Sequence, residues 1–131
     1  MSVSPRDLLR EARNAAEREN EETARRQAIS TAYYAAYHAA REYHNNLPRP
    51  GRSKQGVGEH ENLIHQLRNP DSTLSEEIRN HSTKVGDLLL RLRPSRIRAH
   101  YELQAEIAIR EMRDAIELAA QILNLANLRK P

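Results

Sequence analysis

Residues 25–44 read RRQAISTAYYAAYHAAREYH, and this stretch decides the fold. It contains neither Pro nor Gly, and six of its residues are alanine, so nothing in it opposes an α-helix. Small or aromatic side chains occur nearly all the way round that helix, which indicates that other elements pack on several of its sides. We therefore expect it to be the central helix of a bundle.

The N-terminal residues predict a separate first helix. Ser4 is the expected N-cap, Pro5 is the first helical residue, and Asp7 lies where a carboxylate can reach back to the cap. This helix is predicted to end near Glu17. Asn20 is the expected N-cap of the central helix, so we predict a break between the two, although no residue there forbids a continuous helix.

Turn-forming residues end the central helix near His44 and begin a long basic loop over residues 45–58. A loop of this length in a compact domain is expected to be either mobile or a binding element. A short helix is then predicted over residues 59–68, because Asn69 and Pro70 stop it.

Two long helices are expected in the C-terminal half. The first is predicted to start around Thr73, with Glu76 completing a capping box, and to end at Pro94, which lacks the N–H that a helix interior requires. Residues 93–101 are then an arginine-rich linker. The last helix is predicted over residues 102–128.

These elements predict an all-α fold, an antiparallel bundle of four to five helices in one domain over residues 1–131. Its core must consist of Leu, Ile and Ala, because the chain contains no Trp and no Phe. The lack of cysteine excludes disulfides, thiolate metal sites and thiol nucleophiles. Since we find neither a membrane span of about 20 apolar residues nor the apolar core of a signal peptide, we expect a cytoplasmic protein.

The net charge of +3 is small, but the basic residues are grouped. The densest group falls within eight residues that contain no acid, and its members are Arg91, Arg93, Arg96 and Arg98. Such a run is either a solvated surface or a site for a phosphate group or an RNA backbone.

The six histidines do not predict a metal site. His60 and His65 are five residues apart, so they diverge by about 140° round a helix and cannot hold one ion. The simplest interpretation of His60 is a residue at the edge of the core that makes one hydrogen bond. We expect no metal and no cofactor.

Ser30, Tyr34 and His38 form a polar stripe along the otherwise apolar central helix. If they are buried, they need partners. Either they satisfy one another and the backbone of a neighbouring helix, or they line a cleft beside the arginine-rich linker.

The linker RPSRIRAHY combines arginines with one imidazole, His100. Cleaving RNA without a metal requires a base for the 2′-hydroxyl, an acid for the leaving oxygen and fixed positive charge for the pentacovalent phosphorane. One histidine cannot easily serve as base and acid at the same time. This chemistry therefore predicts a two-fold dimer that brings two His100 side chains to one cleft.

Residues 30–40, STAYYAAYHAA, resemble the signature SRAYYAAFHAA in the second helix of a prokaryotic branch of the HEPN superfamily (higher eukaryotes and prokaryotes nucleotide-binding domains). Residues 98–101 loosely resemble the R-x-A-D-Y block of the same branch. The resemblance covers about residues 5–128. Thr31 stands where the branch commonly has arginine, and His100 stands where it commonly has aspartate.

The resemblance implies a helical bundle that usually dimerises. Many members are ribonuclease toxins with an R-x(4–6)-H motif, encoded beside a nucleotidyltransferase antitoxin that can modify a tyrosine near the motif. Arg93 and His100 fit the upper limit of that spacing, and Tyr101 lies one place earlier than the modified tyrosine. On this basis Arg93 and His100 are the expected catalytic residues, with Arg96 or Arg98 clamping phosphate.

Two functions are expected from these features. The first is a HEPN-type metal-independent ribonuclease that acts as a toxin or defence effector. The alternative is a non-catalytic HEPN module that binds a nucleotide or a nucleotidyltransferase partner, and a purely structural helical adaptor is the remaining interpretation. We expect a homodimer that binds RNA or a nucleotide and no membrane. The residues expected to bind phosphate or nucleotide are Arg96, Arg98, Tyr101, Ser30, Tyr34 and His38.

Overall fold

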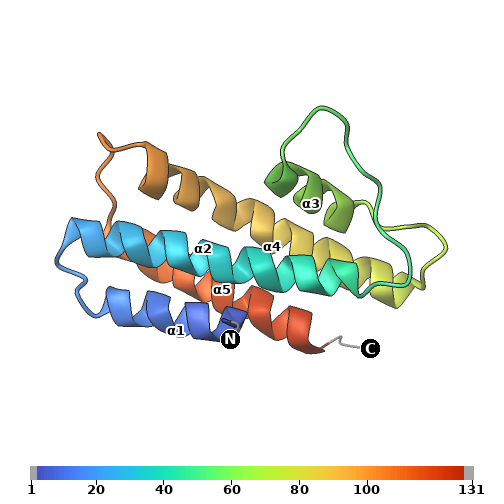
Figure 1. Cartoon of the computed structure of the whole chain (residues 1–131), viewed down its shortest axis with the longest axis horizontal. Helices are drawn as coiled ribbons and strands as arrows, with labels where there is room; N and C mark the ends of the chain where they lie inside the picture. The colour runs from blue at the N-terminus through green and yellow to red at the C-terminus, as the bar shows by residue number, and fades with distance from the viewer. Residues whose placement is uncertain (1–2, 129–131) are drawn as a thin grey trace.

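The computed structural model describes residues 3–128, which form five α-helices joined by loops (Figure 1). The helices are α1 (Pro5–Ala16), α2 (Glu22–Asn45), α3 (Glu59–Arg68), α4 (Glu76–Tyr101) and α5 (Ile109–Leu128). The described residues contain no strand. The prediction of an all-α bundle is therefore confirmed.

α2 is the central helix, as expected, because it packs against each of the other four. Alanine at the contact positions lets the neighbouring backbones approach closely, and alanine loses no side-chain entropy on burial. Tyr33 and Tyr37 are also almost fully buried, at 1% and 4% exposed. The alanines of α2 that are completely buried are Ala28, Ala32, Ala35, Ala36 and Ala40.

The predicted starts of the first three helices are close to the observed ones. Ser4 and Asp7 form the expected capping box: the Asp7 N–H donates to Ser4 Oγ at 3.1 Å, and the Ser4 N–H donates to the Asp7 carboxylate at 3.0 Å. α1 and α2 are separate, and α3 has the predicted bounds. The N-cap of α2 is Glu21, so the assignment of Asn20 was wrong.

α4 begins at Glu76, so the prediction of a start around Thr73 was wrong. Ser75 is the N-cap, and its hydroxyl accepts a hydrogen bond from the Ile78 N–H at 3.2 Å. Thr73 does not cap α4. Its own N–H donates to the Asp71 carboxylate at 2.8 Å, in the local turn that aspartate favours.

The prediction that Pro94 ends α4 was also wrong, since the helix continues to Tyr101 and residues 93–101 are not a linker. Leu92 and Ala99, on either side of Pro94, are buried in the core, so packing holds the chain helical past the proline. The carbonyl that loses its usual N–H partner to the proline is that of Leu90, which lies on an exposed part of α4.

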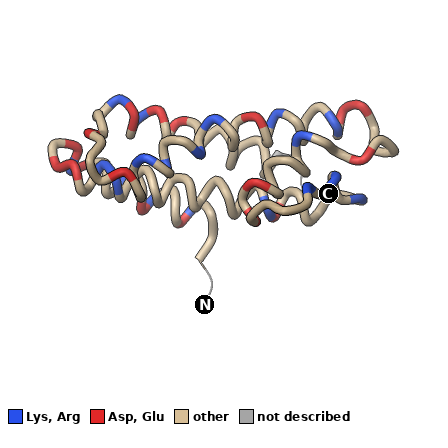
Figure 2. The backbone as a smooth tube through the Cα atoms, turned by 90° about the horizontal axis from the view of Figure 1, so that it is seen from above, with Lys and Arg blue, Asp and Glu red and all other residues tan. Residues whose placement is uncertain are grey.

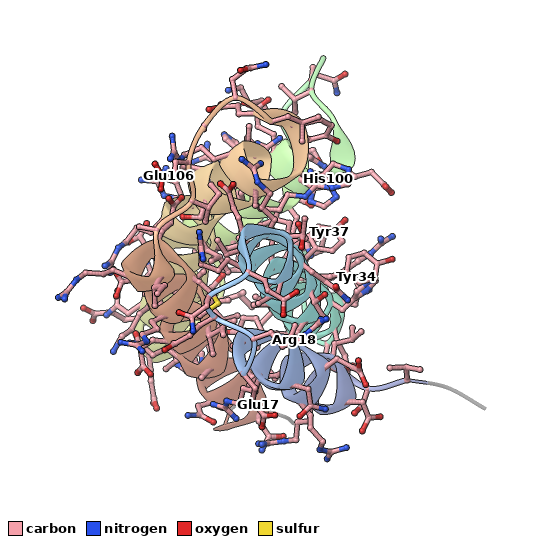
Figure 3. The ribbon with its side chains drawn as sticks, turned by 90° about the vertical axis from the view of Figure 1, so that its left-hand side faces the viewer. Glu17, Arg18, Tyr34, Tyr37, His100 and Glu106 are labelled. Carbon is pink, nitrogen blue, oxygen red and sulfur yellow. The ribbon has the colours of Figure 1, made fainter. Side chains whose placement is uncertain are left out.

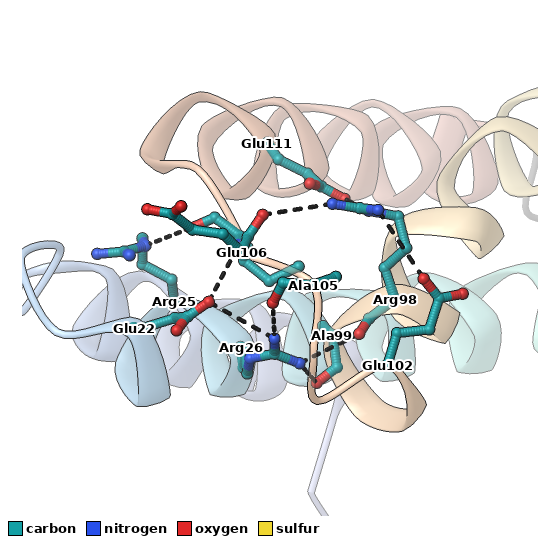
Figure 4. Close-up of polar contacts among 10 residues, drawn as sticks. Glu22, Arg25, Arg26, Arg98, Ala99, Glu102, Ala105, Glu106 and Glu111 are labelled. Carbon is teal, nitrogen blue, oxygen red and sulfur yellow. Dashed lines mark hydrogen bonds and ion pairs between the residues drawn. The ribbon is translucent and has the colours of Figure 1, made fainter.

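The last helix starts at Ile109 and not at residue 102, because residues 102–108 form an irregular segment. Arg26 binds the end of α4 before this segment begins (Figure 4). Its guanidinium donates to the carbonyl oxygens of Arg98 and Ala99 at 3.2 and 3.1 Å, and to that of Ala105. A helix leaves its last carbonyls without N–H partners, and Arg26 satisfies that of Ala99 from another helix.

The neighbouring residues of α2 hold the rest of the segment. Arg25 Nε donates to the Ile107 carbonyl at 2.7 Å, and the Ile107 N–H donates to the Glu22 carboxylate at 2.9 Å. That backbone N–H is the main cause of the lowered pKa of Glu22. The first turn of α2 thus fixes the connection between α4 and α5.

The basic loop over residues 46–58 is bound to α2 and α3 by hydrogen bonds. The Gly51 N–H donates to His44 Nε2 at 3.0 Å, and the Gly51 carbonyl accepts from the Gln66 side chain at 3.2 Å. The Arg52 N–H donates to the Asn69 carbonyl at 3.0 Å. The side chains of Arg52 and of the loop's other two basic residues remain exposed.

The stability of the fold is expected to fall as the pH drops from 7.5 to 5.5, partly through His44. Burial lowers the pKa of His44, whose Nε2 must be unprotonated to accept the Gly51 N–H. Unfolded histidine has a pKa of about 6.5, so the unfolded state binds the proton first as the pH falls through that value. Urea unfolding at several pH values should show that the free energy of unfolding falls less steeply with decreasing pH in His44→Gln than in the wild-type protein. Equal slopes in the two proteins would contradict this.

Charged residues of both signs are interspersed along the helices (Figure 2). No helix within residues 3–128 is long and apolar enough to cross a membrane.

Candidate functional site

Arg93, Arg96 and His100 lie on one face of α4. Because α4 is helical throughout, residues seven apart return to nearly the same direction, so Arg93 and His100 are about 20° apart round the axis and about 10 Å apart along it. Arg96 lies between them. Figure 3 shows His100 on the same side of the molecule as Tyr37 and Tyr34 of α2.

An aromatic cluster from α2 and α3 packs beside this face. The His60 ring stacks on Tyr37 with 4.0 Å between ring centroids, and His60 Nδ1 is 2.8 Å from the Tyr33 hydroxyl. The sequence interpretation of His60 as a residue at the edge of the core with one hydrogen bond is confirmed. The cluster joins all three helices, because the Arg96 guanidinium of α4 lies 5.6 Å from the centroid of the Tyr33 ring.

The two arginines change the titration of the cluster. The pKa of His60 is lowered, first by burial and then by the positive charges of Arg96 and Arg93. Burial raises the pKa of Tyr33 to about 12, against the opposing effect of the same two arginines. At neutral pH, therefore, His60 is uncharged and Tyr33 keeps its proton.

Tyr101 extends the cluster to the end of α4. Its ring lies 5.3 Å from the Arg96 guanidinium and meets the His100 ring edge-on at 4.7 Å. Tyr101 is 62% exposed, and His100 is exposed as well. Both side chains are therefore accessible to a molecule bound on this face.

The stripe of Ser30, Tyr34 and His38 lies on the surface and not in the core. Tyr34 is 51% exposed and meets the His38 ring edge-on at 4.3 Å, while Ser30 is half-buried one turn earlier. The His38 ring is also 5.5 Å from that of Tyr37, which connects the stripe to the cluster. A groove of about 680 Å³ between α1 and α2 runs past Tyr34 and His38.

Arg98 faces another way. Its Nε donates to the Glu111 carboxylate at 3.1 Å, and a second nitrogen lies 3.9 Å from the Glu102 carboxylate (Figure 4). The Glu111 carboxylate is the first cause of the raised pKa of Arg98. Since these contacts hold the connection to α5, we leave Arg98 out of the site.

The two histidines of α3 bind different partners. His65 Nδ1 lies 2.8 Å from the Arg52 carbonyl, whereas His60 contacts Tyr33. Within residues 3–128, no three His, Asp or Glu side chains are grouped so that they could hold a metal ion. The face of α4 carries guanidinium groups, which bind phosphate, and an imidazole, which can transfer protons.

The family model of the HEPN domain matches residues 6–129. No curated protein and no solved structure matches the chain.

Proposed function

The chain belongs to the HEPN family, and on this premise we propose that it is a metal-independent ribonuclease that acts as a toxin or defence effector. The observation that supports the proposal most is the shared face of α4 on which Arg93, Arg96 and His100 lie. Fold membership alone does not decide the activity, so the proposal rests on that arrangement.

In the proposed reaction, one imidazole removes the proton of a ribose 2′-hydroxyl, and the 2′-oxygen attacks the adjacent phosphorus. The bond from phosphorus to the 5′-oxygen breaks, and a second imidazole, in its protonated form, donates a proton to that oxygen. The products are a 2′,3′-cyclic phosphate and a free 5′-hydroxyl. Arg93 and Arg96 stabilise the extra negative charge of the phosphorane.

The two imidazoles are His100 and its copy in a second protomer. HEPN domains often dimerise, and a two-fold axis beside the end of α4 brings two copies of an exposed residue together. In such a dimer, one exposed histidine in each protomer supplies both the general base and the general acid.

The test is the cleavage of single-stranded RNA in excess chelator, compared with DNA of the same sequence. The expected result is RNA fragments ending in 2′,3′-cyclic phosphate and intact DNA, because DNA lacks the attacking hydroxyl. Cleavage that requires added Mg²⁺, or equal cleavage of both polymers, would exclude this mechanism.

The alternative function is a non-catalytic HEPN module that binds a nucleotide or a nucleotidyltransferase partner. The exposure of Tyr101 beside His100 favours it, because a partner enzyme could reach that hydroxyl. If the protein leaves RNA intact in excess chelator but still binds a nucleotide on the α4 face, this second function replaces the first.

A further inference from the structure

The proposed reaction does not use His60, yet this residue is held in a defined orientation. Its ring is fixed by stacking on Tyr37 at 4.0 Å and by the contact between Nδ1 and the Tyr33 hydroxyl at 2.8 Å. Both tyrosines are almost completely buried. The imidazole therefore has little freedom to turn.

The same contact decides which nitrogen of His60 carries the proton. Tyr33 keeps its hydroxyl proton at neutral pH, because burial raises its pKa to about 12. Within residues 3–128, the hydroxyl forms one hydrogen bond, to His60 Nδ1. A buried hydroxyl that did not donate would lose a hydrogen bond without compensation. Nδ1 is thus the acceptor, and the neutral imidazole carries its proton on Nε2.

The Nε2–H of His60 is available to a ligand. It makes no hydrogen bond to the described part of the chain, and every fully buried side-chain nitrogen or oxygen there has a partner. Nε2 must therefore reach the surface. The Arg96 guanidinium lies 5.6 Å from the ring of Tyr33, whose hydroxyl contacts His60, and Arg93 is one turn earlier on the same face of α4. The positive charges of both arginines help to lower the pKa of His60.

Arg93 and Arg96 also lack a counterion. Both are half-buried, and neither forms an ion pair within residues 3–128, whereas Arg98 on the same helix pairs with two carboxylates. Partly buried cations are normally paired, and two beside each other repel. An anion placed between the two guanidinium groups would offset their mutual repulsion and their partial loss of solvation.

We infer that the His60 Nε2–H, together with Arg93 and Arg96, forms a binding site for a phosphate group of single-stranded RNA. This inference rests on the proposed function and adds a residue from α3 to it. The guanidinium groups supply charge and paired donors, and the neutral imidazole supplies a fixed third donor. His60 is a positioning residue, because its Nδ1 is already engaged by Tyr33 and a neutral imidazole is a poor acid.

The experiment follows the ring nitrogens of His60 by NMR in the full chain with ¹⁵N-labelled histidine. The probes are inorganic phosphate and an oligonucleotide that carries 2′-O-methyl groups throughout and so cannot be cleaved. The free protein should show the proton on Nε2, and each probe should shift that resonance in a saturable way. Proton on Nδ1, or an unmoved Nε2 resonance at saturation of the oligonucleotide, would overturn the inference.

Two variants give the energetic test. His60→Ala should bind the oligonucleotide about tenfold more weakly or worse, as expected for the loss of a hydrogen bond to a charged group. Tyr33→Phe keeps the packing but releases Nδ1, so mixed protonation of the ring and weaker binding are expected. Arg91→Ala, from the opposite face of α4, is the matched control and should bind normally. Wild-type affinity in Tyr33→Phe and His60→Ala would refute the site.

These readouts separate the inference from the proposed function. If phosphate and the oligonucleotide shift His60 but wild-type protein never cleaves RNA, the phosphate site stands and the ribonuclease proposal fails. If RNA is cleaved while the His60 resonances do not shift, the ribonuclease proposal stands and the phosphate site fails.

Discussion

Replacement of His100 by alanine is expected to lower the rate of metal-free RNA cleavage by at least about 100-fold. A correctly placed general acid or base contributes about 10²- to 10⁴-fold, and in the proposed dimer this substitution removes both imidazoles at once. The loss should appear in the rate of the chemical step at saturating protein, because His100 is not required to hold the substrate. The measurement is single-turnover cleavage of a labelled RNA in excess chelator.

The fold should not suffer from this change, since His100 is exposed and, within residues 3–128, its ring contacts only that of Tyr101, edge-on. The melting temperature and the affinity for an uncleavable RNA are therefore expected to stay near the wild-type values. If His100→Ala cleaves RNA at the wild-type rate, the assignment of His100 as acid and base is wrong.

Gly51→Ala is expected to lower the free energy of unfolding by about 3 kcal/mol or more. A Cβ at this position would lie 1.9 Å from the backbone oxygen of Gln66 and 2.6 Å from its carbonyl carbon, so the loop must move away from α3. Overpacking typically costs about 1–3 kcal/mol, and the movement also breaks the hydrogen bond from the Gly51 N–H to buried His44. Urea denaturation measures the difference.

The matched control is Gly58→Ala. A Cβ at Gly58 meets nothing within 4 Å, and Gly58 is the N-cap of α3, where exchange of glycine for alanine costs about 1 kcal/mol or less. Should Gly51→Ala be as stable as this control, the loop does not pack against α3 as described.

Much of the fold could be predicted from local sequence signals. The alanine-rich stretch of α2, the Ser4 cap and the residues that stop α3 act within one turn of the chain, so they can be recognised without knowing the tertiary structure. Pro94 misled the prediction because its effect depends on long-range packing. Leu92 and Ala99 bury the helix on both sides of the proline, and the energy of that packing exceeds the local cost.

The site could be predicted only in part. The spacing of Arg93 and His100 was visible in the sequence, and the continuous helix explains why that spacing places them on one face. Two features were not visible. Arg98 turns to Glu111 across a segment predicted to be helical, and His60 joins Tyr33 from a helix 27 residues away in sequence. Contacts between distant segments leave no periodic signal in the sequence.

The central claim is that one face of α4 carries the reaction, and the comparison of Arg91→Ala with Arg93→Ala tests it most directly. The two arginines are two residues apart, so in a helix they point about 160° away from each other, whereas in a flexible linker either could reach the phosphate. In a metal-free RNA cleavage assay, we predict a loss of about 100-fold for Arg93→Ala and wild-type activity for Arg91→Ala. Equal losses in the two variants, or no loss in Arg93→Ala, would contradict the account.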